Sequence, residues 1–392
     1  MTTVDFGSVR QTIRGFGGAE AWFGVMSDQA ISSLFGTGSG QIGLSILRIR
    51  IDPSSTTAGS QWDAELKNAQ KAVATGNNVS VIATPWTPPA AWKINLPNPN
   101  QPLWGGSLDL ANHSADYANY LESYVNYAAS KGVGLYGISM QNEPDANVTT
   151  YEACVWTPGQ MDQWVAELPA GLFGTTKLIM PESESFNTSF SQPALTGANA
   201  VGNIGIIGGH LYGTVPAPYP NAVNAGKDLW MTEHYISGTD ITNALSVAKE
   251  IHDSMTVAGY NAYVWWWVED LASQNSFTGL IDGNNNMKAA GAATAQFARF
   301  VRPGYVRSDV TSSTPGVYVS AYKGSGHFII VAINLGSSDV SQPFTIQNQS
   351  ITSLVPYQTT GSAKVAQQNT VNVSGNQFTY TLPAQSITTF LE

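Results

Sequence analysis

The sequence predicts an α/β protein in two parts, a (β/α)8 TIM barrel and an attached side β-sandwich domain. Two observations lead to this division. Up to about residue 302, short apolar runs alternate with stretches of helical periodicity, whereas beyond residue 303 the apolar residues recur with a period of two. We therefore place the barrel at residues 15–302 and the side domain at residues 1–14 plus 303–392.

Eight apolar runs are candidates for the barrel strands, and stretches long enough for helices separate them. The first run is the weakest, because Gly15-Phe16-Gly17-Gly18 has little strand propensity. Eight such units usually close into a barrel, and a doubly wound open sheet is the alternative. The runs are Gly15–Glu20, Leu44–Asp52, Val79–Trp86, Leu135–Glu143, Lys177–Glu182, Ile204–Tyr212, Asp228–His234 and Ala262–Val268.

Helical signals lie between these runs. Apolar residues recur at helical spacing in 114–130 and again in 241–257. Thr157-Pro158 is typical of a helix start, with an N-cap threonine followed by proline at the first helical position.

The side domain begins after Arg302-Pro303-Gly304. A glycine-containing turn at 324–326 joins two alternating runs into a predicted hairpin. We expect Val4–Phe6 to complete this domain, because the barrel pattern starts only at Gly15. The predicted strands are Val317–Lys323, His327–Asn334, Ser353–Thr359, Thr370–Val373, Phe378–Leu382 and Ser386–Leu391.

Composition narrows the class of ligand. The 27 acidic residues outnumber the 17 basic ones, which disfavours nucleic acid and anionic membranes as partners. Charged residues make up only 11% of the chain, while aromatic ones make up 10%, a combination that suits uncharged, hydroxyl-rich sugars. Cys154 is the only cysteine, so no internal disulfide can form. The low lysine content favours a secreted protein whose leader is absent from this chain, and we expect a monomer.

The residues at the predicted strand ends indicate the chemistry, because barrel active sites form where the strands finish. These ends carry carboxylates, aromatic rings and an amide. The histidines are isolated in the sequence, so we expect no metal and no cofactor. Two carboxylates facing across an aromatic mouth point to glycoside hydrolysis. The end residues are Asp52, Trp86, Asn142, Glu143, Glu182, His210, Tyr212, Glu233, His234 and Trp266.

Two glutamates are the predicted catalytic residues. Glu143 ends the fourth strand and would act as the general acid/base, while Glu233 ends the seventh and would be the nucleophile. The 90 residues between them (233 − 143) match three βα units. Asn142, beside Glu143, can donate a hydrogen bond to a sugar 2-hydroxyl.

Six segments in order along the chain resemble glycoside hydrolase family 30, and more narrowly its xylanase branch. The resemblance implies a retaining (β/α)8 hydrolase with a side β-domain that cleaves β-1,4-xylan outside the cell, with Glu143 as acid/base and Glu233 as nucleophile. Arg302-Pro303-Gly304-Tyr305 resembles the junction into that side domain. The six segments are Gly15-Phe16-Gly17-Gly18, Leu47-Arg48-Ile49-Arg50, Thr84-Pro85-Trp86-Thr87-Pro88-Pro89, Gln141-Asn142-Glu143-Pro144, Thr232-Glu233-His234-Tyr235 and Val264-Trp265-Trp266.

Further residues are assigned to substrate binding. Trp86 and Trp266 are expected to stack on sugar rings, with core packing as the alternative. Tyr212 is expected to hydrogen-bond the nucleophile, as the family's sixth-strand tyrosine does, and Tyr235 is placed in the same group. The pattern does not decide whether Arg48 or Arg50 faces Glu233. Glu182 and Glu184 are expected at the solvent-facing rim, and His234 is expected to be a core histidine.

The loop after the eighth strand departs from the family pattern. The glucuronoxylan-specific branch holds a glucuronic acid group there through an arginine and a tyrosine, and alignment on the tryptophans places Asp270 and Ala272 at those positions. At about 4 Å a carboxylate and a uronate repel by roughly 1–4 kcal/mol. The sequence therefore predicts an endo-β-1,4-xylanase that does not depend on glucuronic acid, unless Lys288 reaches that group.

Three other functions stay open. They are a glucuronoxylan-specific endoxylanase, another family 30 β-glycanase or β-glucosidase, and a non-catalytic carbohydrate-binding protein.

Overall fold

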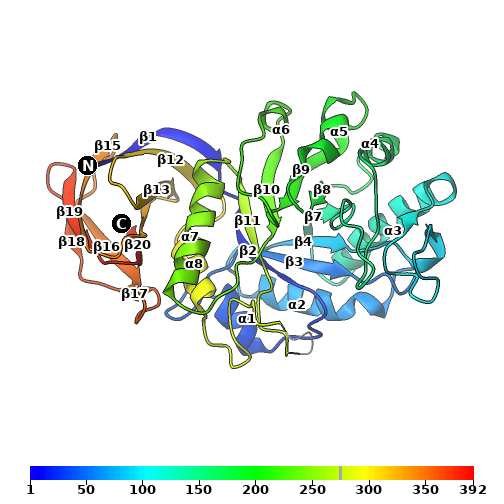
Figure 1. The fold of residues 1–392 in the computed structure, drawn as a ribbon, viewed down its shortest axis with the longest axis horizontal. Helices are drawn as coiled ribbons and strands as arrows, with labels where there is room; N and C mark the ends of the chain where they lie inside the picture. The colour runs from blue at the N-terminus through cyan, green and yellow to red at the C-terminus, as the bar shows by residue number, and fades with distance from the viewer. Residues whose placement is uncertain (273–275) are drawn as a thin grey trace.

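The computed structural model describes residues 1–272 and 276–392. Over this part of the chain, a closed barrel of eight parallel strands lies beside a curled, mostly antiparallel sheet (Figure 1). The fold class expected from the sequence is confirmed.

The barrel closes because its last strand pairs with its first. Tyr263 and Val264 of the last strand lie in register with Phe16 and Gly17 of the first, which excludes the open sheet. Gly17 permits close strand packing, since a Cβ there would lie 2.5 Å from the Ile46 carbonyl oxygen. In order around the barrel the strands are β2 (Gly15–Glu20), β3 (Ile46–Ile51), β4 (Ser80–Pro85), β7 (Leu135–Ser139), β8 (Lys177–Ser183), β9 (Ile204–His210), β10 (Asp228–Glu233) and β11 (Ala262–Trp266).

A helix follows each barrel strand. The predicted start of α4 is present as a capping box, in which Thr157 and Gln160 bond to each other's backbone N–H groups. No helix in the described ranges is long and apolar enough to cross a membrane. The helices are α1 (Asp28–Phe35), α2 (Asp63–Ala74), α3 (Leu110–Ser130), α4 (Pro158–Glu167), α5 (Gln192–Thr196), α6 (Pro220–Asn224), α7 (Ile241–Thr256) and α8 (Ala289–Ala298).

The side domain is one sheet that curls over itself, and β1 (Thr2–Thr12) lies inside it between β12 and β15. Phe378 stacks on Phe344 with ring centroids 4.6 Å apart and also contacts Phe390 from the other half of the sheet, which closes the core. The path runs β17 (Ala366–Gln367), β16 (Ser353–Thr359), β20 (Ser386–Leu391), β14 (His327–Asn334), β13 (Val317–Gly324), β12 (Val306–Ser312), β1, β15 (Val340–Gln347) and β19 (Gln377–Leu382), while β18 (Val371–Asn372) pairs with β16.

The sequence did not indicate several strands of the structure. Strands β12, β15 and β17 of the side sheet were not expected, and neither was the short hairpin of β5 (Lys93–Ile94) and β6 (Ser107–Leu108) in the barrel's third loop.

The barrel and the side sheet share a continuous core. Figure 1 shows α7 and α8 between the two parts. Ile329 and Ile387 of the side sheet belong to the same buried cluster as the residues around the barrel. Gln296 of α8 donates to Thr359 Oγ1 at 2.8 Å across the boundary. The two parts therefore pack directly on each other.

Candidate active site

A cleft of about 570 Å³ opens at the end of the barrel where the strands finish. Its walls are aromatic and acidic, and no lysine or arginine is among the described residues that line it. Six of the seven predicted site residues line this cleft, and the seventh, Asn142, lies buried beneath it. The lining residues are Trp22, Trp86, Trp104, Glu143, Thr150, Tyr151, Glu152, Glu184, Tyr212, Glu233, Tyr235, Trp266 and Trp267.

Glu143 and Glu233 approach each other across the floor of the cleft. One carboxylate oxygen of each lies within 4.8 Å of the other. Glu143 follows β7 with a φ of 44°, and its N–H donates to the Glu182 carbonyl at 3.0 Å. Glu233 ends β10 directly after a register shift between residues 231 and 233. This backbone irregularity re-aims the side chain at the strand end.

His210 lies between the two glutamates and is fully buried. Its Nδ1 is 3.0 Å from Oε1 of Glu143 and 3.9 Å from Oε1 of Glu233, and its Nε2 is 4.0 Å from Glu182. Burial lowers the pKa of His210, but the surrounding carboxylates outweigh it and raise the pKa to about 9. The imidazole is therefore a cation at neutral pH and links both glutamates.

Arg48 holds the carboxylate of Glu233. Its guanidinium donates to Glu233 Oε2 at 2.6 Å and to Asn142 Oδ1 at 2.7 Å. Arg48, and not Arg50, therefore faces the site. Arg50 instead pairs with Glu152 at 2.8 Å.

Glu182 corrects one expectation, since it is fully buried and does not lie at the rim. It accepts hydrogen bonds from Arg48 Nε at 3.2 Å and from Thr84 Oγ1 at 2.9 Å. Burial raises the pKa of this carboxyl. The positive charges of Arg48 and His210 outweigh this effect and lower the pKa to about 2. Glu182 is thus the permanent anion that balances the two buried cations. Glu184, in contrast, does line the cleft.

Opposing effects act on the pKa of Glu233. Burial raises the pKa of Glu233, and the positive charges of His210 and Arg48 counteract this rise. Tyr212 donates its hydroxyl to Glu233 Oε1 at 3.0 Å, the hydrogen bond expected for it. The amide oxygen of Asn142 accepts a hydrogen bond from Arg48, so its NH2 group is free to donate to a substrate hydroxyl.

The two predicted tryptophans form one aromatic wall with a third. The rings of Trp86 and Trp266 have centroids 5.7 Å apart, and Trp22 lies 5.4 Å from Trp86. Trp86 is only 3% exposed, and the Arg48 guanidinium lies 4.7 Å from its ring centre, so core packing accounts for most of its surface. Trp266 is partly exposed and offers more of its ring. Tyr235 also lines the cleft, and its ring centroid lies 5.8 Å from that of Tyr212.

Sequence reasoning missed six lining residues, namely Trp22, Trp104, Thr150, Tyr151, Glu152 and Trp267. Tyr151 donates to Glu143 Oε2 at 3.2 Å, and Glu152 lies next to it. Trp22 and Trp104 complete the walls, and Trp22 has a φ of 67°. None of these residues ends a predicted strand, so the strand-end rule could not select them. His234 bonds Glu250 at 2.8 Å, and its ring centroid lies 5.0 Å from that of Tyr212.

The site does not suit a resident metal ion. Single atoms of Glu143, His210 and Glu233 do lie within 4.8 Å of one another. However, a metal ligand must be a deprotonated nitrogen, and the raised pKa of His210 holds its proton. The Arg48 cation also occupies Glu233 at 2.6 Å. Arg48 and His210 therefore already neutralise the carboxylates that a metal ion would bind.

The geometry instead fits a two-carboxylate displacement. Retaining glycosidases carry their two carboxyl groups about 5–5.5 Å apart, so that one can bond to the sugar while the other protonates the leaving oxygen. One oxygen of Glu143 lies within 4.8 Å of one oxygen of Glu233, which is compatible with that separation and shorter than the roughly 6.5–9.5 Å of an inverting enzyme.

Comparison with known proteins identifies the family of the chain. No family model matches the chain. It is 37% identical over 402 residues to the glucuronoxylanase XynC of Bacillus subtilis strain 168, covering 99% of this chain and 91% of that protein. Among solved structures, it is similar to the glycoside hydrolase family 30 subfamily 8 xylanase Xyn30A from Clostridium acetobutylicum, with a TM-score of 0.91, 40% identity and coverage of 100% and 98%.

A family 30 endoxylanase from Clostridium papyrosolvens C71 gives a TM-score of 0.90 at 39% identity, covering 100% of this chain and 99% of that one. These similarities extend over the barrel and the side sheet together. The chain belongs to glycoside hydrolase family 30.

Proposed function

We propose that this protein is a retaining endo-β-1,4-xylanase. The observation that carries the proposal is the approach of the Glu143 and Glu233 carboxylates, within 4.8 Å, at the floor of an aromatic cleft. Relatives that match nearly the whole chain are named xylanases, which gives the substrate class. A catalytically dead carbohydrate-binding protein would have no need of a buried cation network around both carboxylates.

The residues divide the reaction into two steps. Glu233 attacks the anomeric carbon and forms a glycosyl ester, while Glu143 gives its proton to the departing glycosidic oxygen. Water then hydrolyses the ester, with Glu143 accepting the proton from that water. Arg48 and Tyr212 hold the Glu233 carboxylate in position at 2.6 Å and 3.0 Å. The Asn142 amide can strengthen its hydrogen bond to a 2-hydroxyl as the transition state forms.

We also propose that the enzyme acts without a glucuronic acid side group. Four glutamates and no basic residue line the described cleft, so a uronate entering it would meet like charge. Asp270 does not point a free carboxylate at the substrate, because it accepts from Lys288 Nζ at 2.6 Å and from the Gly279 N–H at 2.9 Å. Lys288 also donates to the Phe277 carbonyl, so this lysine is engaged inside the loop. Residues 273–275 of the loop lie outside the described residues.

Rates on paired substrates test the proposal. Linear xylo-oligosaccharides and arabinoxylan should be cleaved about as fast as glucuronoxylan. Strong preference for the decorated chain, with the acid at one fixed position in each product, would contradict independence from glucuronate. Activity confined to β-glucan or to aryl β-glucosides would assign a different family 30 specificity.

The catalytic roles have their own test. Glu233→Gln should abolish hydrolysis while melting as the wild type does, because an amide has the same shape but cannot form the ester. Proton NMR of early products should show the β-anomer, and initial release of the α-anomer would refute the assignment. Glu184→Gln is the control, because it changes a lining carboxylate other than Glu143 and Glu233 and should retain most activity. Gln141→Glu is not a suitable control, since Gln141 is buried and hydrogen-bonded.

Because xylan is a polymer that is met outside cells, we further propose that the protein works as a secreted monomer. Fractionation of the producing cells tests whether the protein is secreted. The elution volume of the purified protein in size-exclusion chromatography tests whether it is a monomer.

A further inference from the structure

The loop between β7 and α4 holds two neighbouring lining residues against different partners. Tyr151 donates its hydroxyl to Oε2 of Glu143 at 3.2 Å. Glu152 accepts two hydrogen bonds from Arg50, at 2.8 and 2.5 Å. The loop therefore touches the acid/base residue at one position and a buried cation at the next.

Glu152 fixes the position of this part of the loop. Arg50 lies in β3, is 6% exposed and binds both oxygens of Glu152, a fork geometry that sets direction as well as distance. The next residue is fixed too, because the Ala153 N–H donates to the Leu103 carbonyl at 3.0 Å and the Ala153 carbonyl accepts from Lys93 Nζ at 2.8 Å. Tyr151 thus directly precedes two anchored residues.

The other oxygen of Glu143 has a different kind of partner. His210 Nδ1 lies 3.0 Å from Oε1, and with a pKa of about 9 the imidazole is a cation that can only donate. Oε1 is therefore held as an acceptor, so the proton of the acid form belongs on Oε2. Oε2 is the oxygen that Tyr151 contacts.

A phenol hydroxyl suits an oxygen that gains and loses a proton. The Tyr151 hydroxyl can donate to the Glu143 carboxylate and can accept from the Glu143 carboxylic acid. Burial and the negative charge of Glu143 raise the pKa of Tyr151, so the hydroxyl keeps its own proton. Tyr151 is also 39% exposed and lines the cleft, so a hydrogen bond to it directs the Oε2 proton toward the space that the substrate enters.

We propose that Tyr151 is a positioning residue for the acid/base Glu143, and that the Arg50–Glu152 ion pair holds Tyr151 in place. The inference rests on the proposed function, since it needs Glu143 to act as acid and then as base. In the first step the Oε2 proton moves to the glycosidic oxygen as its bond to the anomeric carbon breaks and the bond to Glu233 forms. Tyr151 then donates to the carboxylate left on Glu143. In the second step water bonds to the anomeric carbon, its proton returns to Oε2, and the ester to Glu233 breaks.

The choice of leaving group separates this role from general damage to the site. Tyr151→Phe keeps the ring and removes the hydroxyl. For xylohexaose, whose leaving sugar needs a proton, kcat/KM should fall about tenfold or more. For 2,4-dinitrophenyl β-xylobioside, whose phenolate departs without a proton, kcat/KM should stay within about twofold of the wild type. An equal fall on both substrates, or no fall on xylohexaose, would overturn the inference.

A double-mutant cycle tests the anchor. Glu152→Gln keeps the shape of the side chain and removes the charge that pairs with Arg50, so it should show the same substrate dependence as Tyr151→Phe. Because Glu152 acts through Tyr151, the variant carrying both changes should be about as slow on xylohexaose as the slower single variant. Losses that multiply would show that Glu152 acts on its own and would refute its role as the anchor.

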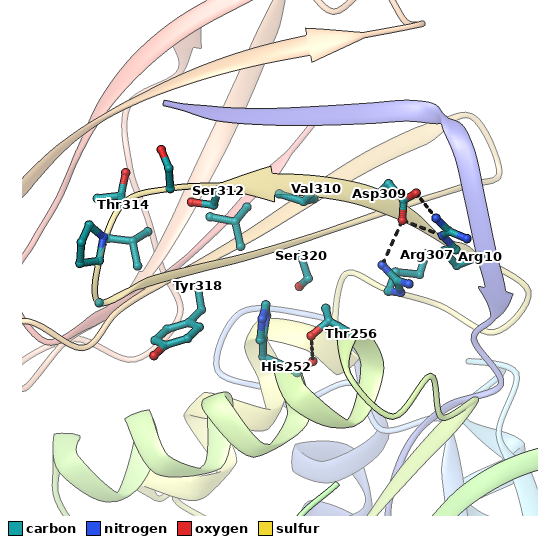
Figure 2. A pocket seen from close by; sticks show the side chains of 15 residues that line it. Arg10, His252, Thr256, Arg307, Asp309, Val310, Ser312, Thr314, Tyr318 and Ser320 are labelled. Carbon is teal, nitrogen blue, oxygen red and sulfur yellow. Dashed lines mark hydrogen bonds and ion pairs between the residues drawn. The ribbon is translucent and has the colours of Figure 1, made fainter. Parts of the chain in front are cut away.

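Two contacts outside the cleft supply matched controls. Tyr127 of α3 donates to Asp63 Oδ1 at 2.8 Å, so Tyr127→Phe removes the same kind of hydrogen bond. Figure 2 shows Asp309 bound to Arg10 in a separate groove of about 770 Å³ between α7 and the side sheet, and Asp309→Asn breaks the same kind of ion pair as Glu152→Gln. Both control variants should hydrolyse the two substrates at wild-type rates.

Glu143→Gln distinguishes this inference from the proposed function. It should lose most activity on xylohexaose and retain kcat/KM on the dinitrophenyl substrate. A Glu143→Gln enzyme that hydrolyses xylohexaose like the wild type, or a wild type inactive on xylohexaose, would refute the proposed function itself. Wild-type rates on xylohexaose in Tyr151→Phe alone would refute only the role of Tyr151.

Discussion

The charge on His210 makes the stability of this protein depend on pH in a defined direction. Burial alone would lower the pKa of His210, but the carboxylates of Glu233, Glu143 and Glu182 raise it from 6.5 to about 9. A raised pKa in the folded state adds stability that is fully present below pH 6.5 and is lost as the pH rises through 9. The shift of 2.5 (9 − 6.5) corresponds to about 3 kcal/mol, at roughly 1.4 kcal/mol for each pKa unit.

Urea unfolding at intervals between pH 6.5 and 9.5 measures this loss, with His210→Asn as the reference. The variant should be less stable at pH 6.5, and the gap between the two proteins should shrink toward pH 9.5. Lys93 acts in the opposite direction over part of this range, because burial lowers its pKa to about 8. Since both proteins contain Lys93, the difference between their curves isolates His210. A gap that stays constant from pH 6.5 to 9.5 would refute a charged His210.

Three further outcomes follow from the contacts of the site and from the shared core. Arg48→Gln removes a cation that opposes the raised pKa of Glu233, so the acid limb of the kcat/KM profile on soluble xylan should move to higher pH while kcat/KM falls by on the order of a hundredfold or more. Tyr212→Phe deletes a single charge-assisted hydrogen bond and should lower kcat/KM by roughly 10- to 100-fold with an unchanged circular dichroism spectrum. A chain ending at Gly304 exposes the core surface that Ile329 and Ile387 cover, and should be insoluble or melt far lower; a soluble barrel with wild-type melting would contradict this.

The barrel strands were predictable because each is a short apolar run bounded by polar or glycine-rich segments, and the structure reproduces all eight. Strand β12 escaped notice because its sequence, VRSDVTS, carries only two apolar residues, and β15 because its sequence, VSQPFTIQ, contains a proline that argues against a strand inside a sheet. They are strands because β1 supplies both with a neighbour, a partnership that no local pattern reveals.

The alternation of side chains along a strand could not predict which site residues face inward. Register shifts interrupt β8 between residues 181 and 183 and β10 between residues 231 and 233. At those points the simple alternation of faces fails, which is why Glu182 was expected at the rim and is buried. The loop residues Trp22 and Tyr151 reach the cleft through tertiary packing alone, so only the folded chain identifies them.

The position of β1 in the middle of the side sheet has a consequence for biosynthesis. Its last residue is Thr12, and its antiparallel neighbour begins at Val306, so the ribosome adds 294 residues (306 − 12) before that neighbour exists. At about 5–20 residues per second, this first-made strand waits roughly 15–60 seconds while the whole barrel emerges. During that time its backbone N–H and C=O groups, and apolar Val4 and Phe6, have no native partner. Newly made chains in this interval are the population most exposed to aggregation, and a chaperone that binds extended segments would protect them most at the N-terminus.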